Sequence, residues 1–181
     1  MRFSRRPRPH AFTMTELLVT LVVIAVLAGI AIPVYNMVVR RSHASKCLGN
    51  LRSLGMSLNL YLPDHNNTMP DWKAARESKE DEGPAIDTEL PAYGATEEVL
   101  RCPGDRRGLW EQTGTSYFWN SALNGQHVSN LNLMGLTDTP TAIPVITDKE
   151  AFHEGAGDGV NILYADGSVQ NRVRFTAEPQ R

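Results

Sequence analysis

The densest set of side chains that could hold a metal ion lies in one acidic segment near the C-terminus of this 181-residue chain. Carboxylate oxygens beside glycines suit a hard cation such as Ca²⁺, but the spacing of an EF-hand is absent. No pair of histidines at helical spacing, of the kind that holds a hydrolytic zinc ion, accompanies them. We therefore expect surface acidity and no cofactor, with Asp148 and Asp158 as weak candidates for calcium. The residues of the segment are Asp148, Glu150, His153, Glu154, Asp158 and Asp166.

Nucleophilic catalysis has little support in the sequence. Ser116, His127 and Asp138 have the residue types of a triad, but no Gly-x-Ser-x-Gly turn surrounds Ser116. The glycines of 155–159 lack the Gly-Lys-Ser/Thr of a phosphate loop. The chain is therefore predicted not to be an enzyme. Three widely spaced tryptophans are predicted to pack rather than to stack on a ligand: Trp72, Trp110 and Trp119.

The charge balance gives no basic surface for nucleic acid. The chain is 41% apolar and 21% charged, with a formal charge of −2. Removal of residues 1–11 would take away four arginines and leave 14 basic against 20 acidic residues. An acidic remainder argues against a nucleic-acid partner.

A stretch of 23 residues, Leu17–Val39, contains no charged side chain. As a helix it would extend roughly 34 Å, enough to cross the hydrocarbon core of a bilayer. Four arginines precede it, and no acidic residue occurs before Glu16. The positive-inside rule then predicts a cytoplasmic N-terminus and an exported C-terminal part.

Two ways of processing this segment are open. A secretory signal peptide would be cut after the apolar core, with Gly29 and Ala31 as the small residues before the cut. The alternative starts from Ala11-Phe12-Thr13-Met14-Thr15-Glu16, which directly precedes the apolar run. This pattern resembles the prepilin signal of type IV pilin-like proteins, in which cleavage comes before the apolar segment and leaves it as an anchor.

The resemblance implies that a prepilin peptidase cuts between Ala11 and Phe12 and methylates the new Phe12 amine. The family usually has glycine before the cut, so Ala11 is a departure. The implied partners are other pilin or pseudopilin subunits, the peptidase, the membrane and an inner-membrane assembly platform.

Glu16 has a physical reason to need a partner. An ionised carboxylate in a membrane-spanning helix costs about 3 kcal/mol and seeks an opposite charge. A freed amine on Phe12 lies one helical turn away, or beside Glu16 of a neighbouring subunit. We expect this pair to set the axial register of a filament; the alternative is that Glu16 marks only the interfacial end of an anchor.

A single helix is predicted over 12–62, with a transmembrane part at 12–39 and an amphipathic part at 40–62. Gly29 and Pro33 lie in the apolar run, and Pro33 is expected to kink the helix. Pro63 and the polar residues after it are expected to end the helix. Apolar positions recur at spacings of three and four beyond the apolar run and need a sheet to cover them: Ala44, Cys47, Leu51, Leu54, Leu58 and Tyr61.

The exported head, 63–181, is predicted to contain a small antiparallel sheet packed on that helix. The connection 63–114 reads as long, irregular and exposed. Asp166-Gly167 predicts a two-residue hairpin turn in which both residues have positive φ. The fold class is α+β and pilin-like. The strand-like segments are 116–123, 142–147, 160–165 and 168–175.

Cys47 and Cys102 are the only cysteines, and export would place both where disulfides persist. We expect them to be paired, although two reduced thiols are the alternative. Without a second pair nearby, they are too few for a structural zinc site.

The C-terminal part shows a second resemblance, to prepilin-type proteins with a His, a nine-residue gap and Asp-Gly. Here twelve residues separate His153 from Asp166-Gly167, three more than in that pattern. Type II secretion pseudopilins of the G kind bind calcium in a C-terminal loop, and the acidic segment is similar only in composition.

Two functions follow from these patterns. The first is a structural subunit of a type IV pilus-like filament, most simply a type II secretion pseudopilin in the inner membrane. The second is a membrane-anchored, extracytoplasmic binding module that does not polymerise.

Overall fold

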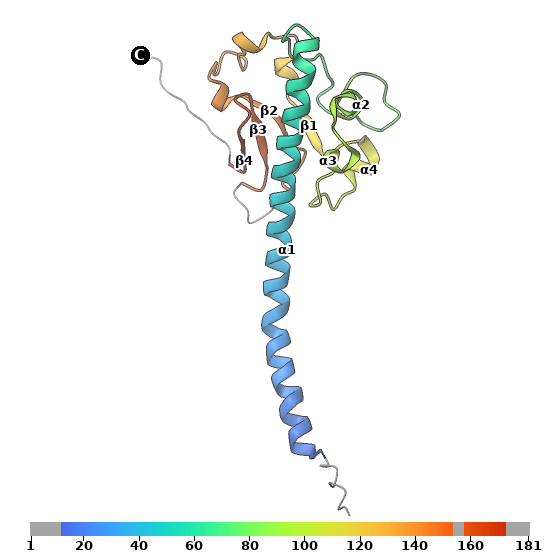
Figure 1. Cartoon of the computed structure of the whole chain (residues 1–181), viewed down its shortest axis with the longest axis vertical. Helices are drawn as coiled ribbons and strands as arrows, with labels where there is room; N and C mark the ends of the chain where they lie inside the picture. The colour runs from blue at the N-terminus through green and yellow to red at the C-terminus, as the bar shows by residue number, and fades with distance from the viewer. Residues whose placement is uncertain (1–11, 154–157, 173–181) are drawn as a thin grey trace, which may run out of the picture. The chain divides into compact units, whose positions relative to one another are not determined.

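The computed structural model describes residues 12–153 and 158–172, and Figure 1 shows its elements along the chain. Ala11, Glu154 and the end of the last predicted strand lie outside these residues. The chain divides into two compact units, Met1–Val39 and Arg40–Arg181. The first helix, α1 (Met14–Asp64), contributes to both.

The part of α1 in the first unit has no protein around it. Its large apolar side chains are exposed from Leu17 to Val38. Within the described residues, α1 is the one helix long and apolar enough to cross a membrane, and none of its apolar window is buried. Helix continues through Gly29 and Pro33. Because Pro33 has no N–H, the Gly29 carbonyl lacks its helical donor, and the kink itself stays a prediction.

The part of α1 in the second unit buries one face. All six positions predicted from the periodicity are among its buried residues. The helix passes through Pro63 and ends at Asp64, two residues beyond the predicted end at Leu62. Asn66 and Asn67 then take positive φ values of 55° and 53°, which turn the chain back toward the head.

The connection 63–114 is not the exposed loop that we expected. It contains four short helices, α2 (Ile86–Glu89), η1 (Leu90–Tyr93), α3 (Glu97–Leu100) and α4 (Leu109–Thr113). Figure 1 shows α2, α3 and α4 to the right of α1. The expectation of exposure was wrong because the buried side chains come singly or in adjacent pairs between polar residues, without a period. They include Met69, Trp72, Ile86, Leu90 and Leu100.

Four short antiparallel strands form the sheet in the order β1-β2-β3-β4. They are β1 (Tyr117–Trp119), β2 (Pro144–Asp148), β3 (Ile162–Tyr164) and β4 (Val169–Gln170). β1, β3 and β4 lie within predicted segments but are shorter, whereas β2 extends one residue beyond its segment, to Asp148. The register between β2 and β3 shifts between Pro144 and Ile146, so Val145 is an extra residue on β2. Three further single turns, η2 (Ser121–Leu123), η3 (Val128–Asn130) and η4 (Pro140–Ala142), connect β1 to β2.

The β3–β4 hairpin is present, but its turn differs from the prediction. Only Gly167 has a positive φ, of 80°, while Asp166 does not. The Gly167 amide donates to the Tyr164 carbonyl, and the Tyr164 amide donates to the Ser168 carbonyl. Asp166 accepts from the Ser168 amide through Oδ1 instead of taking a left-handed conformation. The longer connection explains why one glycine is enough.

The helix packs directly on the sheet at Gly55. A Cβ at this position would lie 3.1 Å from Cδ1 of Leu163 on β3, so the small residue permits close approach. Trp119 of β1 is fully buried, and its ring meets that of Trp72 at a centroid distance of 5.0 Å. A long helix and a small antiparallel sheet thus form an α+β fold consistent with a pilin-like architecture.

Candidate functional site

Thr13 and Glu16 form a reciprocal cap at the start of α1. The Thr13 amide donates to Oε2 of Glu16 at 2.8 Å, and the Thr13 hydroxyl donates to the same oxygen at 2.7 Å. In return the Glu16 amide donates to the Thr13 hydroxyl at 3.2 Å. This is a capping box, which satisfies two amides that a helix N-terminus otherwise leaves without partners. Glu16 is therefore held close to Phe12 by local bonds.

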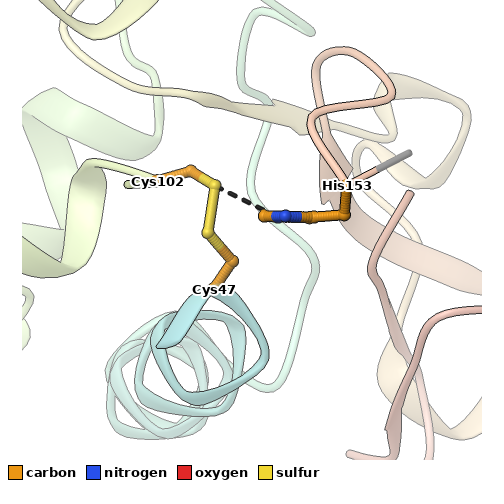
Figure 2. A group of neighbouring side chains, drawn as sticks. All are labelled: Cys47, Cys102 and His153. Carbon is orange, nitrogen blue, oxygen red and sulfur yellow. Dashed lines mark hydrogen bonds between the residues drawn. A yellow bond between two sulfur atoms is a disulfide. The ribbon is translucent and has the colours of Figure 1, made fainter. Parts of the chain in front are cut away.

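A disulfide between Cys47 and Cys102 joins α1 to the segment after α3. Both residues are fully buried, and Figure 2 shows the bond between the helix and the loop. Asn50, one turn later on α1, donates through Nδ2 to the carbonyls of Glu98 and Arg101. The amide thereby holds α3 and the residue before Cys102 against the helix.

Ser116 and Asp105 support Cys102 from the other side. The Cys102 amide donates to the Ser116 hydroxyl, which in turn donates to Asp105. Asp105 also accepts from the Leu109 and Trp110 amides at the start of α4. Burial alone would raise the pKa of Asp105, but these hydrogen bonds to its charged form outweigh burial and lower that pKa.

His153 lies against the disulfide. Its Nε2 atom is 3.3 Å from Sγ of Cys102, and Figure 2 shows the ring directed at that sulfur. A disulfide sulfur carries no hydrogen, so the ring donates and the neutral side chain has its proton on Nε2. A Cβ on Gly104 would lie 2.8 Å from Cε1 of His153, so only glycine leaves room for the ring.

Asp148 completes the buried group at the end of β2. Its Oδ2 atom lies 3.6 Å from Nε2 of His153 and accepts two hydrogen bonds from Asn161. Burial raises the pKa of Asp148 to about 7 against the effect of the Asn161 bonds. Burial, with a smaller effect of His43, lowers the pKa of His153 to about 4. Both shifts favour the neutral forms, so burial opposes an ion pair at this contact.

Comparison with known proteins identifies the N-terminal segment. Residues 6–32 match the model of the prokaryotic N-terminal methylation motif. The chain carries a prepilin-type methylation motif. This motif supports a type IV pilin-like protein and implies processing by a prepilin peptidase and assembly with other pilin subunits. No curated protein and no solved structure matches the chain.

The Ser116, His127 and Asp138 triad is not assembled. Ser116 is fully buried and bonded to Asp105, whereas His127 and Asp138 are exposed. The Nδ1 atom of His127 accepts from the Ser129 amide at the start of η3. Trp72 and Trp119 pack in the core, as predicted. Trp110 is half-buried and has Lys79 over its ring at 4.3 Å.

The acidic C-terminal segment is not gathered into a cluster in the described residues. Asp148 is buried and bonded to Asn161, while Asp158 is exposed. Among residues 12–153 and 158–172, the one group of three potential ligands within 4.8 Å of each other is Cys47, Cys102 and His153. It unites residues that the sequence analysis assigned to two unrelated features.

Two parts of these sites were missed at the level of sequence. The capping box had a visible signal, Thr13-x-x-Glu16, which precedes the apolar run. The approach of His153 to Cys102 had none, since 51 positions separate them. Only the Pro-Gly step after Cys102 indicated a tight turn there.

Proposed function

We propose that this chain is a structural subunit of a type IV pilus-like filament, and specifically a type II secretion pseudopilin. In this proposal it waits in the inner membrane with its N-terminus in the cytoplasm and its head in the periplasm or outside the cell. Polymerisation through the N-terminal helix is its activity, with no catalytic step of its own.

The observation that carries the proposal is the methylation motif, which overlaps the start of a helix whose apolar surface is uncovered. The motif ends at residue 32, inside the exposed apolar run. If the segment were a secretory signal peptide, cleavage would remove the apolar part of the helix from the mature chain. The mature protein would then have no helix through which to assemble. If the helix is retained, lipid buries its apolar surface while the subunit is in the membrane. The helices of other subunits bury the same surface in the filament.

Glu16 has the geometry for a role in assembly. Cleavage before Phe12 would leave the Thr13 N–H as an ordinary amide, so the capping box survives processing. The new Phe12 amine would then be one residue from Thr13 and close to the carboxylate that Thr13 holds. A neighbouring subunit's amine can use the same carboxylate, which supports an axial register.

The experiment is mass spectrometry of the N-terminal peptide from membrane-extracted protein. The proposal requires a peptide that begins at Phe12 and carries an N-methyl group. A terminus near Ile32 would make the chain a secreted soluble protein and would end the assembly model. The uncleaved N-terminus would leave an anchored protein without prepilin processing, which also contradicts the proposal.

An anchor exchange separates the subunit from a tethered binding module. Replacement of residues 1–39 by an unrelated membrane anchor should abolish incorporation into filaments while the head still folds. A binding module would keep its function after this exchange. The burial of Trp72 and Trp119 leaves them unable to stack on a ligand at the surface of the head.

A further inference from the structure

Cys47, Cys102 and His153 could act together as metal ligands once the disulfide is reduced. We propose that the dithiol form of this chain binds one Zn²⁺ through the two cysteine sulfurs and Nε2 of His153. The two cysteines then either form the disulfide or bind the metal ion, and cannot do both at once. This inference does not depend on the role in a filament.

The positions of the three ligand atoms suit zinc. They all lie within 4.8 Å of one another, and Nε2 is 3.3 Å from Sγ of Cys102. Tetrahedral zinc, with bonds of about 2.0 Å to nitrogen and 2.3 Å to sulfur, places neighbouring ligands about 3.4 to 3.8 Å apart. Reduction of the bond frees the two sulfurs to separate to this distance. The required movements are about 1 Å, within the reach of side-chain rotation.

The supporting elements hold the ligands from three directions. Cys47 is on α1, the Cys102 amide is bonded to Ser116, and the His153 amide donates to the Gly159 carbonyl. Gly104 leaves space for the imidazole and no more. Zinc binding through Nε2 requires the other neutral tautomer of His153, with its proton on Nδ1.

The chemistry of the surroundings favours a soft, thiolate-preferring cation. Two thiolates and an imidazole select zinc over calcium or magnesium. The carboxylate of Asp148 lies beside the same Nε2 atom, and its Oδ1 has no hydrogen-bond partner in the described structure. The cysteines are fully buried and His153 is 4% exposed, so the site excludes most water.

The exchange between the two forms balances with one co-reactant, an exogenous disulfide. A newly made chain has thiols, so no reductant is needed to reach the zinc form. An exogenous disulfide then accepts two electrons from the two zinc-bound thiolates and becomes two thiolates. Cys47 and Cys102 form their bond, and Zn²⁺ is released. The zinc form would thus hold the two sulfurs together before oxidation.

The test uses the full chain in detergent micelles, reduced with a phosphine and titrated with Co²⁺ as a spectroscopic probe. We expect one equivalent per chain, with thiolate-to-cobalt charge-transfer absorption and the visible bands of a tetrahedral site. Zn²⁺ should displace the cobalt. The oxidised protein should show none of this absorption. No charge-transfer band in the reduced protein, or the same band in the oxidised protein, would overturn the proposal.

Two variants separate a built site from free thiols. His153→Leu should weaken cobalt binding by at least about 100-fold, because loss of an outer-shell partner alone costs about 10- to 100-fold. The exposed His127→Leu is the matched control and should bind as the wild type does. Equal binding by the two variants would show that the thiols act without His153.

Two further readouts do not require a folded variant. X-ray absorption at the zinc edge of the reduced wild type should give two sulfur ligands and at least one nitrogen ligand; four sulfurs or none would contradict the assignment. Circular dichroism follows the fold. If reduction unfolds the head, Zn²⁺ should restore it, and failure to do so would also refute the site.

Discussion

The Nε2 atom of His153 lies 3.3 Å from the sulfur of Cys102, although 51 positions separate them in the chain. This contact connects the segment after β2 to the disulfide and, through it, to α1. Three segments that are distant in the sequence therefore meet at the disulfide. Their contribution to the free energy of unfolding can be measured with single variants.

The close packing of His153 against Gly104 predicts that Gly104→Ala destabilises the head. The added Cβ would lie 2.8 Å from Cε1 of His153 and 3.0 Å from Cβ of Phe152, and neither is the free end of a flexible chain. We expect a loss of about 1 to 3 kcal/mol in the free energy of unfolding, measured by urea denaturation in detergent. Gly49→Ala, with no atom within 4 Å, is the control; because it lies inside α1, it should cost nothing and gain up to about 1 kcal/mol. Equal stability of the two variants would show that the ring moves aside freely.

The disulfide predicts a larger effect. It joins residues with a sequence separation of 55, so its loss should lower the free energy of unfolding by about 4 kcal/mol in the chain-entropy model. The double variant Cys47→Ala/Cys102→Ala, compared with the oxidised wild type in the presence of a chelator, measures this difference. Reducing agent should leave the double variant unchanged. A difference below 1 kcal/mol would mean that the noncovalent contacts of Asn50 and Ser116 close the head by themselves.

Asp105 predicts a pH dependence of stability. Its folded pKa is lowered, so its contribution is fully present above the unfolded pKa, near 3.8, and is lost as the pH falls through the folded pKa. Asp105→Ala should cost about 1 to 3 kcal/mol at pH 7, because the amides of α4 and Ser116 lose their acceptor. The difference from wild type should shrink below pH 4. Asp138→Ala removes an exposed carboxylate and should be neutral throughout. A cost for Asp105→Ala that stays constant down to pH 2 would contradict the assignment.

The sequence could predict those parts of the fold that repeat or that lie close together in the chain. The buried face from Ala44 to Tyr61 follows the helical period, and the dipeptide Asp166-Gly167 predicts a hairpin from two adjacent residues. The segment 63–114 could not be predicted, because Trp72, Ile86 and Leu90 are buried by tertiary contacts and not by a pattern.

The same distinction applies to the sites. The methylation motif is local and was recognised from a few residues before Leu17. The buried group around the disulfide depends on the fold, and the sequence predicted only the pairing of Cys47 with Cys102. Gly104 leaves room for His153, and Asn161 donates to Asp148. Neither role can be read from the sequence, because the partners are far apart in the chain.

Glu16 has two separable roles, and a pair of variants can distinguish them. Thr13→Val removes the hydroxyl that bonds to Glu16 but keeps the amide that donates to Oε2. Glu16→Gln keeps an acceptor for that amide and removes the charge. If the charge pairs with the Phe12 amine, Glu16→Gln should reduce incorporation into filaments at least tenfold, or about 1.4 kcal/mol. Thr13→Val, which weakens only the cap, should reduce it much less.

Incorporation can be measured by co-expression with the wild-type chain and quantification of the variant in sheared filaments. Membrane insertion of both variants is the control, because the apolar run after Glu16 is unchanged in each. Equal, small effects of the two substitutions would mean that Glu16 acts as a helix cap and that something other than its charge sets the register. A strong effect of Glu16→Gln alone would show that assembly needs the charge of Glu16 and not its capping bonds to Thr13.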